Sequence, residues 1–206
     1  ECEPELIDIK FISEPWDCGG LYKLGDFPSK NTFTWNGHFR DDLRRFWKGD
    51  KDTAWNMSDK IKGTPSIYKE DNIFPKSINF ITSHDGFTLK DLVTFNRKHN
   101  FANREQNRDG DNHNNSWNHG TEGPTTNLLI NDLRKRQQKN LVLSLLISKG
   151  VPMILMGDEI GRSQGGNNNS WCQNNLLGWM NWEHGQQDLE LLEYFKYVIK
   201  IRKKLI

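Results

Sequence analysis

The sequence contains few cysteines and lacks long apolar runs. Its three cysteines, Cys2, Cys18 and Cys172, are odd in number and widely spaced, and no C-x-x-C motif is present. This pattern predicts neither a disulfide framework nor a zinc site. No apolar stretch reaches membrane-spanning length, and no secretory leader is visible. We therefore expect a protein of a reducing, intracellular compartment that does not contact a membrane.

The sequence also lacks an excess of charge of either sign. Its 28 Lys and Arg residues are balanced by 27 Asp and Glu residues, which gives a formal net charge of +1. A balanced charge excludes the broad electrostatic attraction on which binding to nucleic acid or an anionic membrane depends. We expect neither partner.

Aromatic residues, in contrast, are abundant. They make up 11% of the 206 residues and include eight tryptophans. Most tryptophans fill protein cores, but a tryptophan in a loop rich in Asn, Asp and Gly offers a flat apolar surface on which a sugar ring can stack. Trp16, Trp35 and Trp171 lie in or next to such stretches.

Predicted strands and helices alternate along the chain. Short apolar runs predict strands, and apolar residues at helical spacing predict amphipathic helices. Asp52 is expected to cap the second helix, and Thr88 with Asp91 forms a capping-box pattern at the third. The strands are expected at 7–13, 33–35, 77–83 and 152–156, and the helices at 39–47, 52–62, from 88, 127–149 and 189–206.

This alternation predicts an α/β fold with a parallel sheet built from about four βα units. Four units are half of a (β/α)8 barrel, and a complete one usually needs about 250 residues. Residues 1–206 are therefore expected to form half of such a barrel. Such a half-barrel would leave edge strands unpaired and apolar faces uncovered, so we expect poor stability for the chain alone. Two long polar loops, 100–125 and 161–175, interrupt the pattern and are of a length that is commonly functional.

Carboxylates follow two of the predicted strands. Glu14 comes directly after the first, and His84-Asp85 follows the third. Parallel strands deliver their carboxyl-terminal residues to one rim of a barrel, and two carboxylates on a rim are the usual equipment for cleaving a glycosidic bond. From the residues alone, Glu14 could equally be a salt-bridge partner, and the His-Asp pair could cap the helix that begins near Thr88.

The surrounding motifs favour the catalytic interpretation. The stretch 13–20, SEPWDCGG, and the stretch 79–89, NFITSHDGFTL, resemble the acid/base and transition-state-stabilising motifs of the α-amylase superfamily of glycoside hydrolases. Within it the chain is most similar to the isoamylase and glycogen-debranching branch. Four further stretches extend the resemblance over nearly the whole chain: 35–41 (WNGHFRD), 117–125 (WNHGTEGPT), 156–159 (MGDE) and 166–173 (GNNNSWCQ).

The resemblance implies roles for individual residues. Glu14 would protonate the departing glycosidic oxygen and then act as base on water, which requires a raised pKa that burial against Trp16 could supply. Asp85 would hold the hydroxyls of the distorted sugar most tightly in the transition state, and His84 would donate to the same sugar unit. Trp16, Trp35 and Trp171 would stack against glucose units. No cofactor or metal is implied.

The nucleophile of the family is missing. A retaining glycosidase needs a carboxylate about 5–5.5 Å from the acid, and the family supplies it in a Gly-Phe-Arg-x-Asp motif that this sequence does not contain. Asp8, Asp26 and Asp158 are the nearest strand-end or loop carboxylates, but none follows Phe-Arg. We expect the nucleophile upstream of residue 1, the rest of the catalytic domain as a partner, and no turnover by this chain alone.

The resemblance predicts hydrolysis of α-1,6 branch linkages in glycogen, amylopectin or a limit dextrin. Two alternatives stay open: an α-1,4-acting amylase or glucan transferase of the same superfamily, and a truncated, non-catalytic chain that binds glucan or regulates an active partner. The expected location is the cytoplasm, with a plastid as the alternative.

Overall fold

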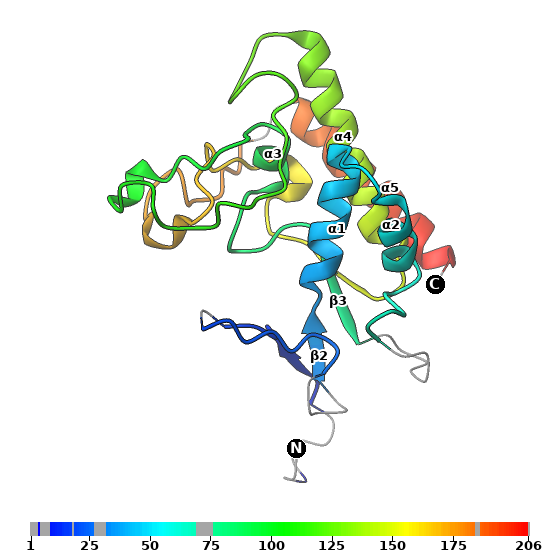
Figure 1. The fold of residues 1–206 in the computed structure, drawn as a ribbon. Helices are drawn as coiled ribbons and strands as arrows, with labels where there is room; N and C mark the ends of the chain where they lie inside the picture. The colour runs from blue at the N-terminus through cyan, green and yellow to red at the C-terminus, as the bar shows by residue number, and fades with distance from the viewer. Residues whose placement is uncertain are drawn as a thin grey trace.

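The computed structural model describes residues 4, 9–17, 19–26, 32–68, 76–183 and 186–205. Within them lies one four-stranded, wholly parallel sheet in the order β1-β2-β3-β4 (Figure 1). The strands are β1 (Phe11–Ser13), β2 (Thr32–Trp35), β3 (Ser77–Phe80) and β4 (Val151–Met153). The predicted α/β fold with a parallel sheet is confirmed.

Among the described residues, α-helices and 3-10 turns accompany the sheet. The helices are α1 (Gly37–Lys48), α2 (Ala54–Ile61), α3 (Leu89–Leu92), α4 (Leu128–Ile147) and α5 (Gln186–Leu205). The 3-10 turns are η2 (Phe101–Asn103), η3 (Asp158–Ile160) and η4 (Ser170–Cys172). All five predicted helices are present, and their bounds differ from the prediction by a few residues, apart from α3, which is a single turn.

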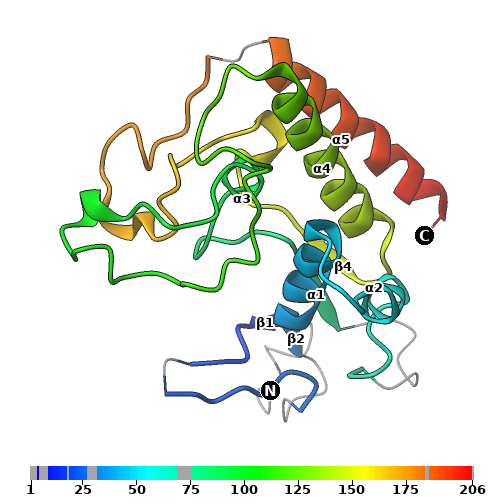
Figure 2. The same ribbon diagram turned by 45° about the horizontal axis from the view of Figure 1, so that its top comes forward.

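The core lies among the helices and the start of the loop after β3. Phe39 and Leu43 of α1 are fully buried and pack in one cluster with Leu141 and Leu145 of α4 and Phe195 of α5. Both views show α4 and α5 running side by side (Figures 1 and 2). These two helices are also joined by an ion pair between Lys139 Nζ and Glu190 Oε1 at 2.6 Å.

No helix is predicted between the first two strands, and the described part of this connection agrees. The described residues between β1 and β2, 14–17 and 19–26, contain no helix and form a hairpin-like turn closed by a bridge between Trp16 and Tyr22. Asp17 Oδ1 holds this turn by accepting from the amides of Gly19 and Leu21, at 2.8 and 3.0 Å. The expected residues 5–8 of the first strand lie outside the described part of the chain.

Two predicted helix signals behave differently in the structure. Asp52 does not cap α2, because it adopts a left-handed backbone (φ 59°) and Thr53 occupies the cap position. Only half of the capping box at α3 forms: the Thr88 hydroxyl accepts from Asp91 N at 3.2 Å. The Asp91 carboxylate instead accepts from Gln164 N at 2.7 Å and from the Ser163 hydroxyl, and so holds the loop 161–175.

Candidate functional site

The predicted site residues lie where parallel strands end at one edge of the sheet. Glu14 follows β1, Trp35 is the last residue of β2, and His84 and Asp85 lie four and five residues after β3. β2 pairs with both β1 and β3, so the three strand ends are adjacent. The structure therefore delivers Glu14, Trp35 and the His-Asp pair to the carboxyl edge of the sheet, where α/β enzymes bind their ligands.

Trp35 and His84 are in contact. Their ring centroids are 5.7 Å apart in an edge-on arrangement, and the Trp35 ring also packs against Phe80. His84 Nε2 lies 3.5 Å from Asp85 Oδ2, and the two side chains are 60% and 70% exposed. Both polar groups are thus free to reach a ligand while Trp35 supports the imidazole from the side.

Glu14 is exposed, and this corrects one expectation. Trp16 was expected to bury Glu14, but its ring stacks on Tyr22, with centroids 5.8 Å apart and planes 11° from parallel. Burial of Glu14 against Trp16 is therefore not provided by this arrangement.

An open groove of about 580 Å³ has Trp16 and Tyr22 in its lining. The other predicted residues of the sheet edge, Glu14, Trp35, His84 and Asp85, do not line it. One wall is aromatic, because Tyr22 stacks on Trp16 and meets His38 edge-on at 5.4 Å. The other wall is charged: Arg40 donates to both carboxylate oxygens of Asp41, at 2.7 and 3.0 Å. Flat aromatic faces next to fixed charged donors and acceptors match the apolar faces and hydroxyl rim of a sugar.

Tyr22 and Arg40 were not singled out from the sequence. Tyr22 could have been found, since Trp16 and Tyr22 lie on either side of the Gly19-Gly20 pair, and an aromatic pair across a turn is typical of facing residues in a hairpin. Arg40 lies in the stretch 35–41 that carries part of the family resemblance, and this motif was the signal that could have singled it out.

Trp171 is not brought to this groove. It is 76% exposed on η4, which lies beside η2 and away from β1 and β2 in both views (Figures 1 and 2). Asn103 Nδ2 donates to Asn169 O at 2.8 Å and ties the two turns together. Stacking of Trp171 on a sugar stays a prediction, at a position remote from the strand ends.

The two long polar loops form one interlocked unit through asparagine side chains. Asn100 and Asn168 exchange hydrogen bonds at 2.8 and 3.0 Å, and Asn167 Nδ2 donates to Asn103 Oδ1 at 2.8 Å. Lys98 is also buried, and its ammonium donates to three backbone carbonyls, those of Arg108, Asp109 and Gly110. Because buried polar groups with satisfied partners specify one arrangement, the loops are held as a defined structure despite their length.

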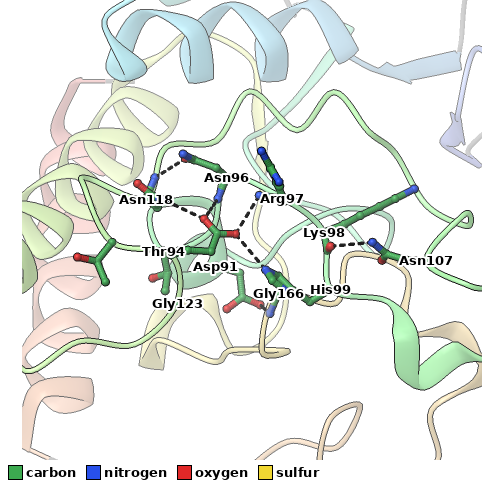
Figure 3. Close-up of polar contacts among 12 residues, drawn as sticks. Asp91, Thr94, Asn96, Arg97, Lys98, His99, Asn107, Asn118, Gly123 and Gly166 are labelled. Carbon is green, nitrogen blue, oxygen red and sulfur yellow. Dashed lines mark hydrogen bonds and ion pairs between the residues drawn. The ribbon is translucent and has the colours of Figure 1, made fainter.

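Glu122 fixes a second part of the long loop onto the segment after α3. Its carboxylate accepts from the amides of Asn96 and Arg97, at 2.8 and 3.1 Å, and from the side chain of Asn118. Asn118 N in turn donates to Asn96 Oδ1 at 2.7 Å, one of the contacts drawn in Figure 3. Although partial burial opposes it, this set of hydrogen bonds lowers the pKa of Glu122 to about 2.

Glu122→Gln should therefore make the stability of the protein less dependent on pH. A carboxylate with a lowered pKa in the folded state stabilises that state above its unfolded pKa and loses the effect as the pH falls toward the folded value. We expect the variant to be less stable than the parent by about 1 kcal/mol at pH 7, a figure reduced for solvent screening. The difference should shrink between pH 5 and pH 2 in unfolding experiments. A difference that does not change with pH would contradict this account of the loop.

The remaining predicted features can be placed briefly. Asp26 is exposed, Asp158 is buried, and Asp8 lies outside the described residues. Cys172 is exposed, whereas Cys2 and Cys18 also lie outside. Within the part of the chain that the structure describes, no group of three His, Cys, Asp or Glu side chains could hold a metal ion. In the same residues no helix is long and apolar enough to cross a membrane.

Comparison with curated proteins identifies close relatives. The chain is 45% identical over 204 residues to isoamylase 1, chloroplastic, of Oryza sativa subsp. japonica, covering 98% of this chain and 25% of the relative. It is 46% identical over 203 residues to the glycogen operon protein GlgX homolog of Mycobacterium tuberculosis, covering 98% and 28%. It is 43% identical over 205 residues to the glycogen debranching enzyme of Erwinia tasmaniensis, covering 98% and 31%. No protein-family model matches the chain.

Solved structures show the same fold. The pullulanase from Bacillus acidopullulyticus superposes with a TM-score of 0.67 at 21% identity, over 94% of this chain and 22% of that one. The pullulanase complexed with maltotetraose from Anoxybacillus sp. LM18-11 gives a TM-score of 0.69 at 18% identity, over 97% and 27%. At sequence identities this low, the similarity shows a shared fold and not a shared function.

The resemblance read from the motifs is thus confirmed by relatives that match nearly the whole chain. The chain spans about a quarter to a third of the length of these curated relatives. Over a segment of that length its sequence is similar to the isoamylases and glycogen operon proteins.

Proposed function

We propose that this chain is part of the catalytic domain of a glycogen or starch debranching enzyme, which hydrolyses α-1,6-glucosidic branch linkages with retention of configuration. The observation that carries the proposal is the meeting of Glu14, Trp35 and the His84-Asp85 pair at one edge of the parallel sheet. The relatives named isoamylase and glycogen debranching enzyme, at 43–46% identity over nearly the whole chain, support it.

The chemistry follows from what each group can do. Glu14 gives its proton to the glycosidic oxygen as the bond to the anomeric carbon breaks, and afterwards removes a proton from the attacking water. Asp85 accepts hydrogen bonds from the sugar hydroxyls, which strengthen as the ring flattens toward the oxocarbenium-like transition state. His84, steadied by Trp35, donates to the same sugar.

The nucleophile is proposed to come from the part of the catalytic domain that this sequence does not contain, so that residues 1–206 act as the C-terminal half of a (β/α)8 barrel. Exposed apolar side chains near the sheet support this. Ile12 of β1 is 60% exposed and Met156, after β4, is 63% exposed, although apolar strand residues are normally covered. The rest of the barrel would cover them and would pair the edge strands β1 and β4.

The proposed substrate is a branched α-glucan such as glycogen, amylopectin or a limit dextrin. Trp16 and Trp35 are proposed to stack against its glucose units. Tyr22 is added because its ring and that of Trp16 form one aromatic wall of the groove. The relatives named isoamylase and glycogen debranching enzyme support this class of ligand. Both the cytoplasm and a plastid fit the relatives, since some are bacterial and others are named chloroplastic.

The test is product analysis with the full-length protein that carries this chain. Acting on amylopectin, it should release linear chains and raise iodine staining, and it should leave linear amylose intact. Cleavage of amylose would favour an α-1,4-acting amylase, and chains of new length without net hydrolysis would favour a transferase. Glucan binding without any bond cleavage would overturn the proposal in favour of a non-catalytic binding or regulatory chain.

A further inference from the structure

The turn that carries the proposed catalytic aspartate is held at both of its ends by one buried carboxylate. This turn runs from the end of β3 to the start of α3 and presents His84 and Asp85. Asp158, in the 3-10 turn η3 after β4, reaches both sides of it. Its Oδ1 accepts from Leu89 N at 2.9 Å, and its Oδ2 accepts from the Thr82 hydroxyl.

Two further contacts fix the same turn, one just before Thr82 and one between Thr82 and Leu89. The Arg44 guanidinium of α1 donates twice to the carbonyl of Ile81, at 2.9 and 2.6 Å. Gly86 N donates to Asn168 O at 2.9 Å, which attaches the turn to the loop 161–175. The backbone on either side of His84 and Asp85 is therefore anchored, whereas their side chains point into solvent.

The buried position of Asp158 disfavours the ionised form of its carboxyl group. It is only 3% exposed, and both of its hydrogen-bond donors are neutral. Burial therefore raises the pKa of Asp158 to about 7, opposed by these two hydrogen bonds, and the carboxylates of Glu159 and Asp91 raise it further. Burying a carboxylate in such surroundings costs free energy. What Asp158 provides in return is two acceptor oxygens that fix the positions of Thr82 and Leu89.

We propose that Asp158 is a positioning residue, which acts through Thr82 and the Leu89 amide to hold Asp85 at the place where it meets the transition state. This inference rests on the proposed function of Asp85. It gives Asp158 a role that differs from that of a nucleophile, because both of its oxygens are occupied inside the protein.

Two substitutions separate the geometry of Asp158 from its charge. In Asp158→Asn the amide oxygen can still accept from Leu89 N, and the NH2 group can donate to the Thr82 oxygen, so both contacts are retained. In Asp158→Ala both partners lose their acceptor. Since a misplacement of about 1 Å can cost roughly 100-fold in rate, the alanine variant should lower kcat by about 30–100-fold and change KM by less than about 3-fold. The asparagine variant should restore most of kcat.

A double-mutant cycle with Asp85→Asn in the full-length protein tests the coupling. If Asp158 acts through Asp85, adding Asp158→Ala to the Asp85→Asn variant should lower kcat by no more than about 3-fold. Asp59→Ala is the matched control, because the Asp59 side chain is also largely buried, at 14% exposed, but it accepts from the amide and the hydroxyl of Ser66, away from the turn 81–89. Its effect should be the same in both backgrounds. An equal loss from Asp158→Ala in both backgrounds would overturn the proposal.

Amide hydrogen exchange tests the role of Asp158 without relying on glucan cleavage. Asp158→Ala should speed amide exchange in the segment 81–89, and Asp59→Ala should do so at Ser66 instead, whether or not the protein cleaves glucan. Unchanged exchange in 81–89 would refute the positioning role by itself. A full-length protein that cleaves no glucan, but shows faster exchange in 81–89 in the alanine variant, would refute only the proposed function.

Discussion

Glu14→Gln should abolish hydrolysis of branched glucan by the full-length protein while leaving glucan binding nearly unchanged. Gln has the size of Glu but no proton to donate to the leaving oxygen, and general acid-base catalysis contributes roughly 100- to 10,000-fold. Because Glu14 is exposed at the end of β1, its replacement should not disturb packing. We expect kcat to fall by about 1,000-fold or more, measured as reducing ends released from amylopectin, with the dissociation constant for a limit dextrin within about 2-fold of the parent.

The matched control is Asp26→Asn. Asp26 is an exposed carboxylate in the same connection between β1 and β2, and it forms a surface ion pair with Lys23 at 3.5 Å. Its loss should leave kcat within about 2-fold, since exposed pairs contribute little. Parent-like turnover by the Glu14→Gln variant would remove Glu14 from the acid/base role.

Asp85→Asn should lower the rate by several powers of ten with a much smaller effect on ground-state affinity. Asp85 is 70% exposed and lies beside His84, so it can reach a sugar bound over Trp35. Asn keeps the shape but loses the charge that strengthens hydrogen bonds to the sugar hydroxyls in the transition state, and such bonds supply several kcal/mol. The measurement is kcat and KM for amylopectin, together with direct binding of a limit dextrin.

The pattern of the loss decides the role of Asp85. A fall in kcat with unchanged binding identifies an interaction made in the transition state, whereas a rise in KM alone identifies uniform binding. If only affinity suffers, Asp85 merely holds the substrate. Asp132→Asn, an exposed carboxylate of α4, serves as the control and should change neither constant.

Several elements could be predicted from local sequence because local contacts determine them. The long helix after Asn127 is an example: the Asn127 side chain accepts from the amides of Leu129 and Ile130, so the helix start is encoded within four residues. The parallel sheet is similar, since alternating strands and helices leave few other topologies.

Other features depend on contacts between distant segments. The third strand was expected to reach Ser83 but ends at Phe80, because the carbonyl of Ile81 accepts from Arg44, 37 residues away. Asn36 followed by Gly37 predicts a turn, yet Asn36 Oδ1 accepts from Phe39 N at 2.9 Å and starts α1 instead. The two Asn-rich loops were predicted to be functional, but their mutual hydrogen bonds join residues more than 60 positions apart and give no local signal.

The candidate site shows the same division. Glu14, His84 and Asp85 could be named from motifs, and the strand order accounts for their shared edge. The exposure of Glu14 and the pairing of Trp16 with Tyr22 could not, because they depend on how the turn after β1 folds back. Asp158 is the clearest example. Its motif, 156–159, was recognised in the sequence, but its hydrogen bonds to Thr82 and Leu89 could be seen only in the structure.

The central claim is that Glu14 is the acid/base of a retaining enzyme whose nucleophile lies outside residues 1–206. The most direct test is to incubate the full-length Glu14→Gln protein with α-maltosyl fluoride, whose fluoride leaves without help from an acid. The covalent glycosyl-enzyme should accumulate because no base activates water to hydrolyse it. Peptide mass spectrometry should then find the maltosyl group on an aspartate of a Gly-Phe-Arg-x-Asp segment outside this sequence. A maltosyl group on a carboxylate within residues 1–206, or no covalent adduct, would contradict the account.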